Sequence, residues 1–337
     1  MTLPIKPPYP PMEALLVAEL PRGASWQYEP KWDGFRCLAF RDGQNLELQS
    51  KSGQTLGRYF PEVLEALLKL KATKFVIDGE LVITIKGDPS FDALLQRIHP
   101  AASRVAKLAQ ETPARLIVFD ILVDEQGKKI LDEPLVKRRK RLEAFAKKYF
   151  SRNATVELSP QTADASLALS WLEDPSVRLD GVIAKRLDLP YRTGERDGMQ
   201  KIKKLRTADC VVGGFRYASS GKVVGSLLLG LYDKDGLLHH VGYTSSFTEA
   251  EKKELTKLLE PLIKPPGFTG NKPGGPSRWS TKKTSEWEPL KTKLVAEIRY
   301  DHFTGGRFRH GTKFLRWRPE KKPRQCGFEQ LGAKAAE

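Results

Sequence analysis

The segment Tyr28-Glu29-Pro30-Lys31-Trp32-Asp33-Gly34-Phe35-Arg36 places an amine, a carboxylate, a glycine and a guanidinium within a window of six residues. It lies at the mouth of a predicted β-hairpin, whose strands at 35–40 and 46–48 flank an Asp-Gly turn that supplies the positive φ of a tight turn. An amine in this setting is a candidate nucleophile for covalent phosphoryl transfer. The pattern Lys-x-Asp-Gly-x-Arg is short, so other segments have to support this interpretation.

Beyond this segment, apolar spacing predicts alternating strands and helices. Strands are expected at 75–85, 115–122 and 181–185, and helices at 61–70, 90–98 and 135–149. From residue 208 onward the pattern changes to short apolar runs separated by glycine, with a helix at 248–263 and a Pro/Gly-rich loop at 265–276. A small β-barrel with one inserted helix, as in an OB-fold, has this pattern. The chain is therefore predicted to be an α+β protein with domains at 1–206 and 207–337.

The charge distribution predicts a polyanionic partner. The 337 residues carry a formal net charge of +16, of which +10 lies from Arg206 to the end of the chain. Between His302 and Arg324, eight basic residues and one acidic residue are interleaved with aromatic side chains. Because phosphates neutralise such a surface and release counterions, we expect nucleic-acid binding that weakens steeply with salt.

Other features exclude several classes of protein. The three cysteines lie more than a hundred residues apart, which excludes a zinc ribbon or a disulfide framework, so no chemistry is assigned to them. The N-terminal prolines are unlike a secretory signal, and the apolar runs are much shorter than the ~20 residues of a membrane helix. A cytosolic protein that does not span a membrane is expected.

Seven further segments follow the Lys31 segment along the chain. They are Ser50-Lys51-Ser52-Gly53, Ile77-Asp78-Gly79-Glu80-Leu81-Val82, Gly87-Asp88-Pro89-Ser90-Phe91, Leu116-Ile117-Val118-Phe119-Asp120, Leu179-Asp180-Gly181-Val182-Ile183-Ala184-Lys185, Lys201-Ile202-Lys203 and Phe314-Leu315-Arg316-Trp317-Arg318-Pro319-Glu320-Lys321. In this order they resemble the motifs of covalent nucleotidyltransferases, and among these the ATP-dependent DNA ligases of the short bacterial type, such as ligase C and the ligase domain of ligase D. The resemblance implies an ATP-grasp-like nucleotidyltransferase domain, the catalytic core of DNA ligases, followed by an OB-fold β-barrel.

The resemblance also implies roles for individual residues, with Lys31 as the nucleophile that takes AMP from ATP. Contacts with the adenosine are implied for Glu29 at the adenine edge, Phe119 against the base, and Arg36 and Glu80 at the ribose. Lys201 and Lys203 would hold the α-phosphate, and Arg316, Arg318 and Lys321 the leaving pyrophosphate. Lys51 and Lys185 are also implied to bind the nucleotide. Glu80 and Asp180 would hold Mg²⁺ or Mn²⁺. Because lysine is protonated at neutral pH, burial by Trp32, the cations Lys201 and Lys203 and a bound metal would have to lower the pKa of Lys31.

Four positions depart from the family pattern. Asp180 and Glu320 exchange the usual carboxylate for one of different length, and Met199 stands where many relatives have tryptophan. Lys51 replaces an arginine, so a planar fork of donors becomes a point charge. The contacts of Lys51 and Asp180 are therefore the ones that the resemblance predicts least securely.

The activity implied is sealing of 5′-phosphate/3′-hydroxyl nicks in duplex DNA through lysyl-AMP and a DNA-adenylate, by a monomer in the bacterial cytosol or nucleoid, in DNA repair. The second domain would rotate about a hinge near 204–208. An RNA ligase and a GTP-dependent RNA-capping guanylyltransferase of the same superfamily remain alternatives, as does a non-enzymatic nucleic-acid-binding protein. With 28 residues before Glu29 and no zinc-binding cysteines, we expect neither a DNA-encircling domain nor an NAD-dependent ligase.

Overall fold

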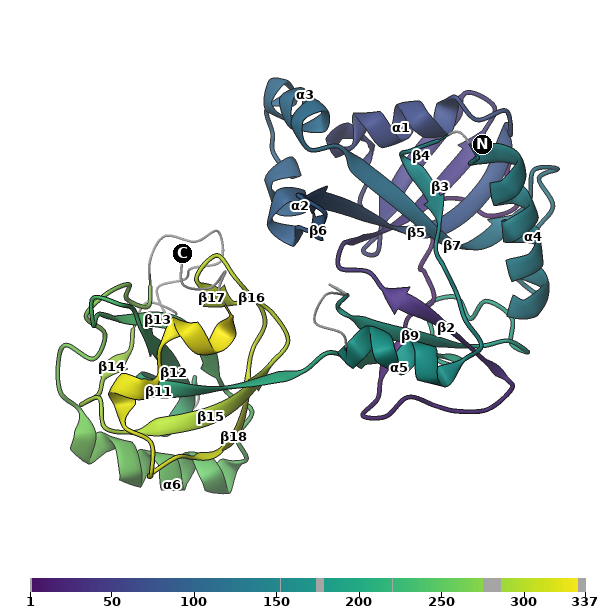
Figure 1. The fold of residues 1–337 in the computed structure, drawn as a ribbon. Helices are drawn as coiled ribbons and strands as arrows, with labels where there is room; N and C mark the ends of the chain where they lie inside the picture. Colours follow the sequence, from purple (N-terminus) through teal and green to yellow (C-terminus); the bar gives the residue numbers. More distant parts are fainter. Residues whose placement is uncertain (1, 152, 174–178, 220, 275–285, 333–337) are drawn as a thin grey trace. The chain divides into compact units, whose positions relative to one another are not determined.

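The computed structural model describes residues 2–151, 153–173, 179–219, 221–274 and 286–332. The chain divides into two compact units, Met1–Lys204 and Leu205–Glu337 (Figure 1). Among the described residues, none of the helices is both long enough and apolar enough to cross a membrane.

The first unit contains two sheets. The larger has the strand order β4 (Asn45–Ser50), β3 (Phe35–Asp42), β5 (Lys74–Ile85), β7 (Ala114–Val123) and β8 (Val156–Leu158), and β6 (Asp88–Pro89) pairs with β5. The smaller has the order β1 (Leu15–Leu16), β10 (Met199–Lys203), β9 (Gly181–Arg186) and β2 (Trp26–Lys31). Lys31 is thus the last residue of β2, and the chain then crosses from the smaller sheet to the larger one.

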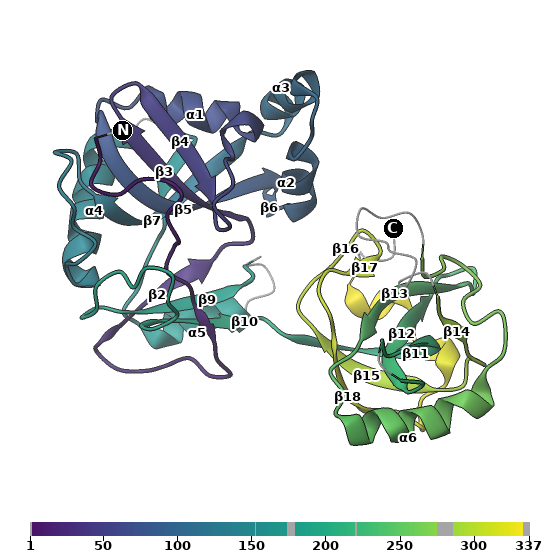
Figure 2. The same ribbon diagram turned by 180° about the vertical axis from the view of Figure 1, so that it is seen from behind.

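Both faces of the larger sheet are buried, because successive side chains of a strand point to opposite faces. On β3, Cys37 and Ala39 belong to a core shared with α1 (Pro61–Leu68) and α4 (Leu135–Tyr149), whereas Leu38 and Phe40 belong to a second core shared with the N-terminal segment. Figures 1 and 2 show α1 and α4 packed against this sheet. The sheet is therefore fixed on one face by helices and on the other by the chain that precedes β1.

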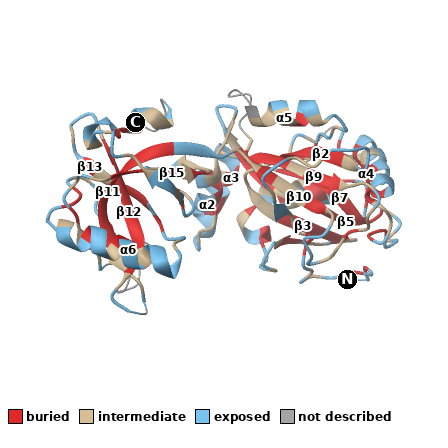
Figure 3. Ribbon diagram, turned by 90° about the horizontal axis from the view of Figure 1, so that it is seen from below, coloured by how far each residue is buried: buried red, intermediate tan, exposed pale blue. Residues whose placement is uncertain are grey.

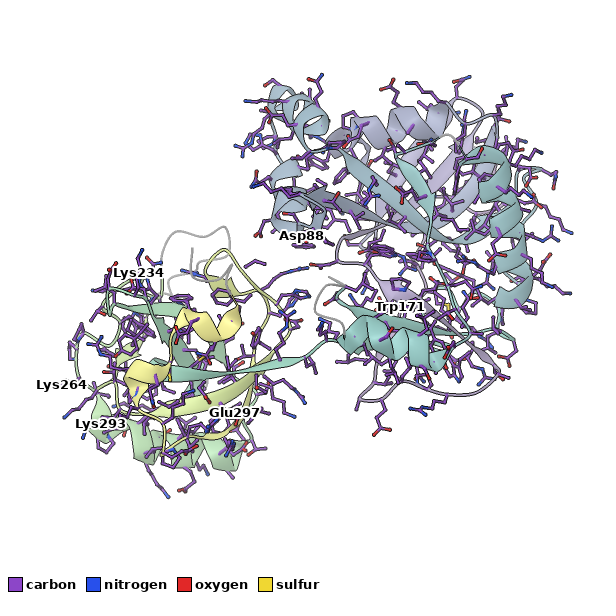
Figure 4. The ribbon with its side chains drawn as sticks, viewed as in Figure 1. Asp88, Trp171, Lys234, Lys264, Lys293 and Glu297 are labelled. Carbon is purple, nitrogen blue, oxygen red and sulfur yellow. The ribbon has the colours of Figure 1, made fainter. Side chains whose placement is uncertain are left out.

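The helices of this unit form where the sequence supplies an apolar face and a suitable first residue. In α4, Leu135, Leu142, Phe145 and Ala146 are buried on one face. The Ser90 hydroxyl accepts a hydrogen bond of 3.3 Å from the Ala93 amide and so caps α2 (Phe91–Arg97). The unit also contains α3 (Ala102–Glu111) and α5 (Ala165–Glu173), which packs through Ala168 and Trp171 (labelled in Figure 4) on a small core under β2 and β9.

The second unit is built on one antiparallel sheet. Its order is β13 (Leu238–Thr244), β12 (Val224–Tyr232), β11 (Arg206–Tyr217), β15 (Val295–Tyr300) and β18 (Lys313–Trp317), with β14 (Glu288–Pro289) paired to β11. The hairpin of β16 (Phe303–Thr304) and β17 (Arg307–Phe308) lies outside this sheet, and α6 (Glu249–Leu259) begins with a capping box between Thr248 and Glu251. Figure 3 shows buried residues along β11 and β12 and exposed ones along the outside of α6.

The predicted α+β class and OB-fold are confirmed, but the expectation of a barrel is corrected. Over the described residues the sheet of the second unit is open, because β13 and β18 are not paired as strands. They meet through a single bridge between Thr244 and Thr312, where the Thr312 amide donates to the Tyr243 carbonyl at 3.2 Å. The chain leaves β13 directly after this bridge, so the ladder cannot continue and close the sheet.

The predicted hairpin, strands and helices are present at the expected places. The helix expected at 248–263 is α6 followed by a 3₁₀ turn at Glu260–Leu262. In the loop expected at 265–276, residues 265–274 have neither helix nor strand, and residues 275 and 276 lie outside the described residues. The sequence patterns did not predict β2, α3 or α5.

Candidate active site

A cavity of about 140 Å³ lies in the first unit where the two sheets approach each other. Both sheets contribute to its lining, and the N-terminal segment forms one wall. Eight of the predicted residues line it, namely Glu29, Lys31, Arg36, Lys51, Glu80, Phe119, Lys185 and Lys201. The wall made by Pro11, Met12, Glu13 and Ala14 was not predicted, and neither was the contribution of Ile183.

The predicted nucleophile and a predicted metal ligand are direct partners. The Lys31 amine donates a hydrogen bond to the carboxylate of Asp180, which immediately precedes β9. The backbone supports this contact, since the Asp180 amide donates to the Lys31 carbonyl at 3.1 Å. The Asp180 side chain is only 4% exposed, whereas that of Lys31 is 20% exposed and faces the cavity. Lys31 is therefore held at the cavity by a buried carboxylate.

Two glycines allow the backbone to bring these residues together. A β-carbon at Gly34 would lie 2.0 Å from the Leu81 carbonyl oxygen of β5, and one at Gly181 would lie 1.9 Å from the Ile202 carbonyl oxygen of β10. Both positions therefore require glycine because another backbone approaches closely. Close backbone contacts therefore explain the glycines of the Asp-Gly pairs at 33–34 and 180–181 independently of any chemistry.

Arg36 is fixed by a buried carboxylate on the neighbouring strand. Its guanidinium donates to both carboxylate oxygens of Asp78, at 2.5 and 2.6 Å, and to the Met12 carbonyl at 3.1 Å. Burial opposes the charge of this guanidinium, yet the adjacent Asp78 carboxylate keeps the pKa of Arg36 above its usual value. The guanidinium carbon lies 4.6 Å from the centre of the Phe119 ring, so the arginine and the aromatic ring form one continuous surface of the cavity.

A second ion pair, which is buried, also lies against Phe119. The Lys185 amine donates to Glu29 at 2.8 Å and lies 4.4 Å from the centre of the Phe119 ring. The other carboxylate oxygen of Glu29 accepts a hydrogen bond of 2.7 Å from the Gln27 amide. Glu29 and Lys185 are 2% and 5% exposed, so their positions are fixed before any ligand binds.

Burial changes the titration of two residues that line the cavity. It raises the pKa of Glu80 to about 7, against the opposing effect of the Arg36 and Lys31 cations. Burial lowers the pKa of Lys201, and the neighbouring amines Lys31 and Lys203 lower it further. Glu80 therefore changes its charge near neutral pH, at the edge of a cavity that is otherwise rich in cations.

Two predicted ligands of the nucleotide have less specific positions. Lys51 is 58% exposed and pairs with Glu13 at 3.0 Å, a partner that the sequence did not reveal. Lys203 lies on β10 opposite Gly181, next to Asp180, but does not belong to the lining of the cavity. The resemblance predicted both lysines, and neither lies as deep as Lys185.

The three remaining predicted residues lie in the second unit. Arg318 and Lys321 donate to the carboxylate of Asp209 at 3.0 and 2.7 Å. Arg316 donates to Glu297 (labelled in Figure 4) at 2.6 Å, and Arg318 donates to Glu320 at 2.5 Å. Each of these three cations is therefore paired with a carboxylate of its own unit.

Comparison with known proteins gives consistent matches over both units. Residues 14–203 match the family described as ATP dependent DNA ligase domain, and residues 220–321 match the ATP dependent DNA ligase C terminal region. The chain is 45% identical to DNA ligase C1 of Mycolicibacterium smegmatis, over 98% of this chain and 96% of that protein. It is 31% identical to the multifunctional non-homologous end joining DNA repair protein LigD of Mycobacterium tuberculosis, over 90% of this chain and 37% of that protein.

The fold is also found among solved structures. A Lig E DNA ligase, described as binding DNA with a minimal scaffold, aligns with a TM-score of 0.54 at 18% identity, over 91% of this chain and all of that one. At this identity the likeness concerns the fold alone.

Proposed function

This chain belongs to the ATP-dependent DNA ligases, and from that premise we propose that it seals 5′-phosphate/3′-hydroxyl nicks in duplex DNA with Lys31 as the adenylated residue. The observation that carries the proposal is the position of Lys31 at the cavity, held by Asp180 and surrounded by Arg36, Glu80 and Lys201. The predicted nucleophile therefore lies beside cations that can hold phosphate oxygens and carboxylates that can hold a metal ion, which phosphoryl transfer requires.

In the first step, the Lys31 nitrogen would attack the α-phosphorus of ATP. A nitrogen–phosphorus bond forms, the bond between the α-phosphorus and the bridging oxygen breaks, and pyrophosphate leaves while the nitrogen loses a proton. The nitrogen needs a free lone pair for this attack, so the Lys31 amine has to be neutral. A neutral amine keeps two N–H groups and can go on donating to Asp180, whose carboxylate can take the proton that leaves as the nitrogen–phosphorus bond forms. Lys201, with its lowered pKa, lies at the cavity where it can stabilise charge on the α-phosphate.

The charged pairs suit a bound nucleotide. Phe119 offers the aromatic surface for the adenine, and the Glu29–Lys185 pair beside it offers an acceptor and a donor at the edge of the base. Arg36, held by Asp78, and Glu80 offer a donor and an acceptor for the ribose hydroxyls. In the two later steps, AMP passes to a DNA 5′-phosphate and is displaced by a 3′-hydroxyl.

Glu80 and Asp180 fit the divalent metal that the family implies. Both offer carboxylate oxygens, which Mg²⁺ and Mn²⁺ prefer, and Glu80 is a half-buried carboxyl whose pKa of about 7 a nearby cation would lower. When bound, the ion supplies neutralisation of phosphate charge. Asp180 accepts from Lys31 through one carboxylate oxygen, and because a carboxylate has two oxygens it would be able to hold the ion and Lys31 together.

In the second unit, Arg316, Arg318 and Lys321 would bind the leaving pyrophosphate. Their present partners Asp209, Glu297 and Glu320 would be exchanged for phosphate oxygens. We further propose that the enzyme acts as a monomer in the bacterial cytosol or nucleoid, and in DNA repair, a role supported by its similarity to part of a LigD repair protein.

The proposal is tested by incubating the wild type and Lys31→Ala with α-labelled ATP or GTP and Mg²⁺, followed by denaturing electrophoresis and addition of nicked DNA. We expect covalent label from ATP that requires Lys31 and is discharged as the nick is sealed. Label from GTP alone would favour a capping enzyme, and sealing of RNA but not DNA nicks would favour an RNA ligase. Absence of label would contradict all three enzymes and favour the non-enzymatic nucleic-acid-binding protein.

A further inference from the structure

The loop between β9 and β10, residues 187–198, holds the N-terminal segment that forms the cavity wall. Four of its residues make contacts with that segment. The Tyr191 hydroxyl accepts from the Met12 amide at 2.9 Å, the Thr193 and Tyr9 hydroxyls lie 2.6 Å apart, the Glu195 carbonyl accepts from the Glu13 amide at 2.8 Å, and Arg196 pairs with Glu13 at 3.2 Å. The wall is therefore positioned by a loop that lies between two of the segments that resemble family motifs, 179–185 and 201–203, but belongs to neither.

The contacts with Glu13 continue to Lys51, which is 58% exposed, whereas that of Tyr191 continues to Arg36, which is 18% exposed and lines the cavity. The Tyr191 hydroxyl donates to Asp78 at 2.6 Å, and Asp78 pairs with Arg36. Arg36 in turn donates to the Met12 carbonyl at 3.1 Å, and the Met12 amide donates back to Tyr191. These four residues form a closed ring of hydrogen bonds that joins the wall of the cavity to the arginine inside it.

Three of the four members of the ring are buried and Arg36 is 18% exposed, so water reaches the ring from the side of Arg36 and not from that of Tyr191. Tyr191 is 3% exposed, Met12 is 5% exposed and Asp78 is fully buried. Burial and the adjacent Asp78 carboxylate raise the pKa of Tyr191 well above its usual value, so its hydroxyl keeps its proton and remains a donor. The Tyr191 ring is also fixed from behind, because Arg138, which pairs with Asp120, lies 5.8 Å from its centre.

We propose that Tyr191 is a positioning residue for nucleotide binding, which acts by coupling the N-terminal wall at Met12 to Arg36 through Asp78. The proposal rests on the proposed function, because it takes Arg36 as a ligand of the ribose. Without the hydroxyl, the Met12 amide loses its acceptor and Asp78 loses one of its donors. Arg36 would then be held by a less constrained carboxylate, and the wall that accepts its other hydrogen bond would be free to move.

The experiment compares Tyr191→Phe with Tyr9→Phe in the full-length chain. Both variants remove a hydroxyl that contacts the loop or the segment, but Tyr9 does not contact Asp78 or Arg36 in the described hydrogen bonds. The rate of Lys31 labelling is measured against the concentration of ATP and of 2′-deoxy-ATP. For Tyr191→Phe we expect the KM for ATP to rise roughly tenfold with little change in kcat, and the preference for ATP over 2′-deoxy-ATP to fall.

A double-mutant cycle with Arg36→Lys tests the route of the effect, since residues that act through one another are not additive. Equal changes in KM for Tyr191→Phe and Tyr9→Phe, or additive effects with Arg36→Lys, would overturn the proposal. The wild type is the reference for the function itself. If it takes no label, the proposed function fails, whereas normal labelling with an unchanged KM in Tyr191→Phe contradicts only the role of Tyr191.

A second measurement applies to the wild type and does not depend on the folding of a variant. Amide hydrogen exchange of the segment 11–14 is followed with and without ATP. If the wall and Arg36 are coupled, nucleotide binding slows exchange of the Met12 amide. An exchange rate that ATP does not change would count against the coupling.

Discussion

The charged residues expected to bind the nucleotide are held differently in the two units. In the first unit Arg36, Glu29 and Lys185 pair with buried partners that also bind further groups, so their positions are fixed by several bonds. In the second unit Arg316 is 61% exposed and pairs with a carboxylate of the same sheet. The first arrangement suits a preformed pocket, and the second suits cations that exchange one anion for another.

This difference has an energetic reason. A buried charge is costly unless its partners are in place, so the first unit has to keep its ion pairs even without a ligand. Exposed pairs contribute little, so cations such as Arg316 can leave Glu297 at small cost when a phosphate is offered. We therefore expect substitutions in the first unit to affect stability and chemistry, and those in the second unit to affect mainly chemistry.

The largest effect is expected from Lys31→Ala, which removes the atom that carries AMP. Covalent labelling should fall by roughly 10⁴-fold or more, without loss of folding. The matched control is Lys69→Ala, an exposed lysine of the same unit that pairs with Glu65. The assay is the initial rate of labelling from α-labelled ATP, and a labelled Lys31→Ala protein would place the nucleophile elsewhere.

The second largest effect is expected from removing one partner of a buried ion pair, and the quantity that changes is the free energy of unfolding. Asp120 accepts both bonds of the Arg138 fork at 2.9 Å, and both side chains are 2% exposed. Asp120→Asn should cost about 3–5 kcal/mol of unfolding free energy, because a buried guanidinium loses its counter-charge. Glu297→Gln in the second unit should cost less than about 1 kcal/mol.

Chemical denaturation of both variants measures this difference. Equal losses would remove the distinction drawn between the two units. The Asp120 pair also predicts acid sensitivity. Burial raises the pKa of the Asp120 carboxyl, but Arg138 lowers it further, so that the pKa in the folded protein lies below the usual value near 3.8. The ion pair therefore stabilises the fold above pH 3.8, and this stabilisation is lost as the pH falls through the lower pKa of the folded protein.

Arg318→Ala should slow labelling of Lys31 by roughly 10²-fold, because the variant lacks a cation that stabilises the leaving pyrophosphate. Sealing of a DNA-adenylate prepared in advance should be nearly unchanged, because no pyrophosphate leaves in that step. The two rates are measured on the same protein preparation. An equal loss in both steps would show that Arg318 supports the fold or DNA binding instead.

The smallest effect is a dependence on pH carried by Glu80. Its pKa is raised from 4.5 to about 7, so the ligand-free fold binds this proton more tightly than the unfolded chain. The protein should therefore lose stability as the pH rises from about 4.5 to 7, while the charged Glu80 becomes available to ribose and metal. The KM for ATP should fall between pH 6 and 8 in the wild type, and this change should be absent in Glu80→Gln.

The sequence predicted the part of the site whose geometry is local. Lys31 is the last residue of β2, and Gly34 lets the chain pass close to β5, so the spacing of the motif and its position in space are linked. The pairing of Asp180 with Lys31 follows from the register of β2 and β9, in which Lys31 lies opposite Gly181. Such register cannot be read from either segment alone.

The rest of the site depends on contacts between distant segments. Glu13 and Tyr191 are 178 positions apart in the chain, and the packing of the N-terminal segment against the β9–β10 loop makes Glu13 part of the cavity wall and Tyr191 a support behind it. The alternating pattern of β13 and β18 likewise predicted strands but not whether they would pair, because closure depends on where the chain leaves each strand. A single polar residue such as Tyr191 has no local signal that separates a pocket residue from a surface one.

The central claim is that the cavity of the first unit presents Lys31, among the lysines around it, to the α-phosphate. It is tested most directly by peptide mapping of the wild-type protein after reaction with ATP and Mg²⁺. The account predicts one AMP group on the peptide that contains Lys31, and its loss when nicked DNA is added. AMP on Lys51, Lys185, Lys201 or Lys203 instead would contradict the account.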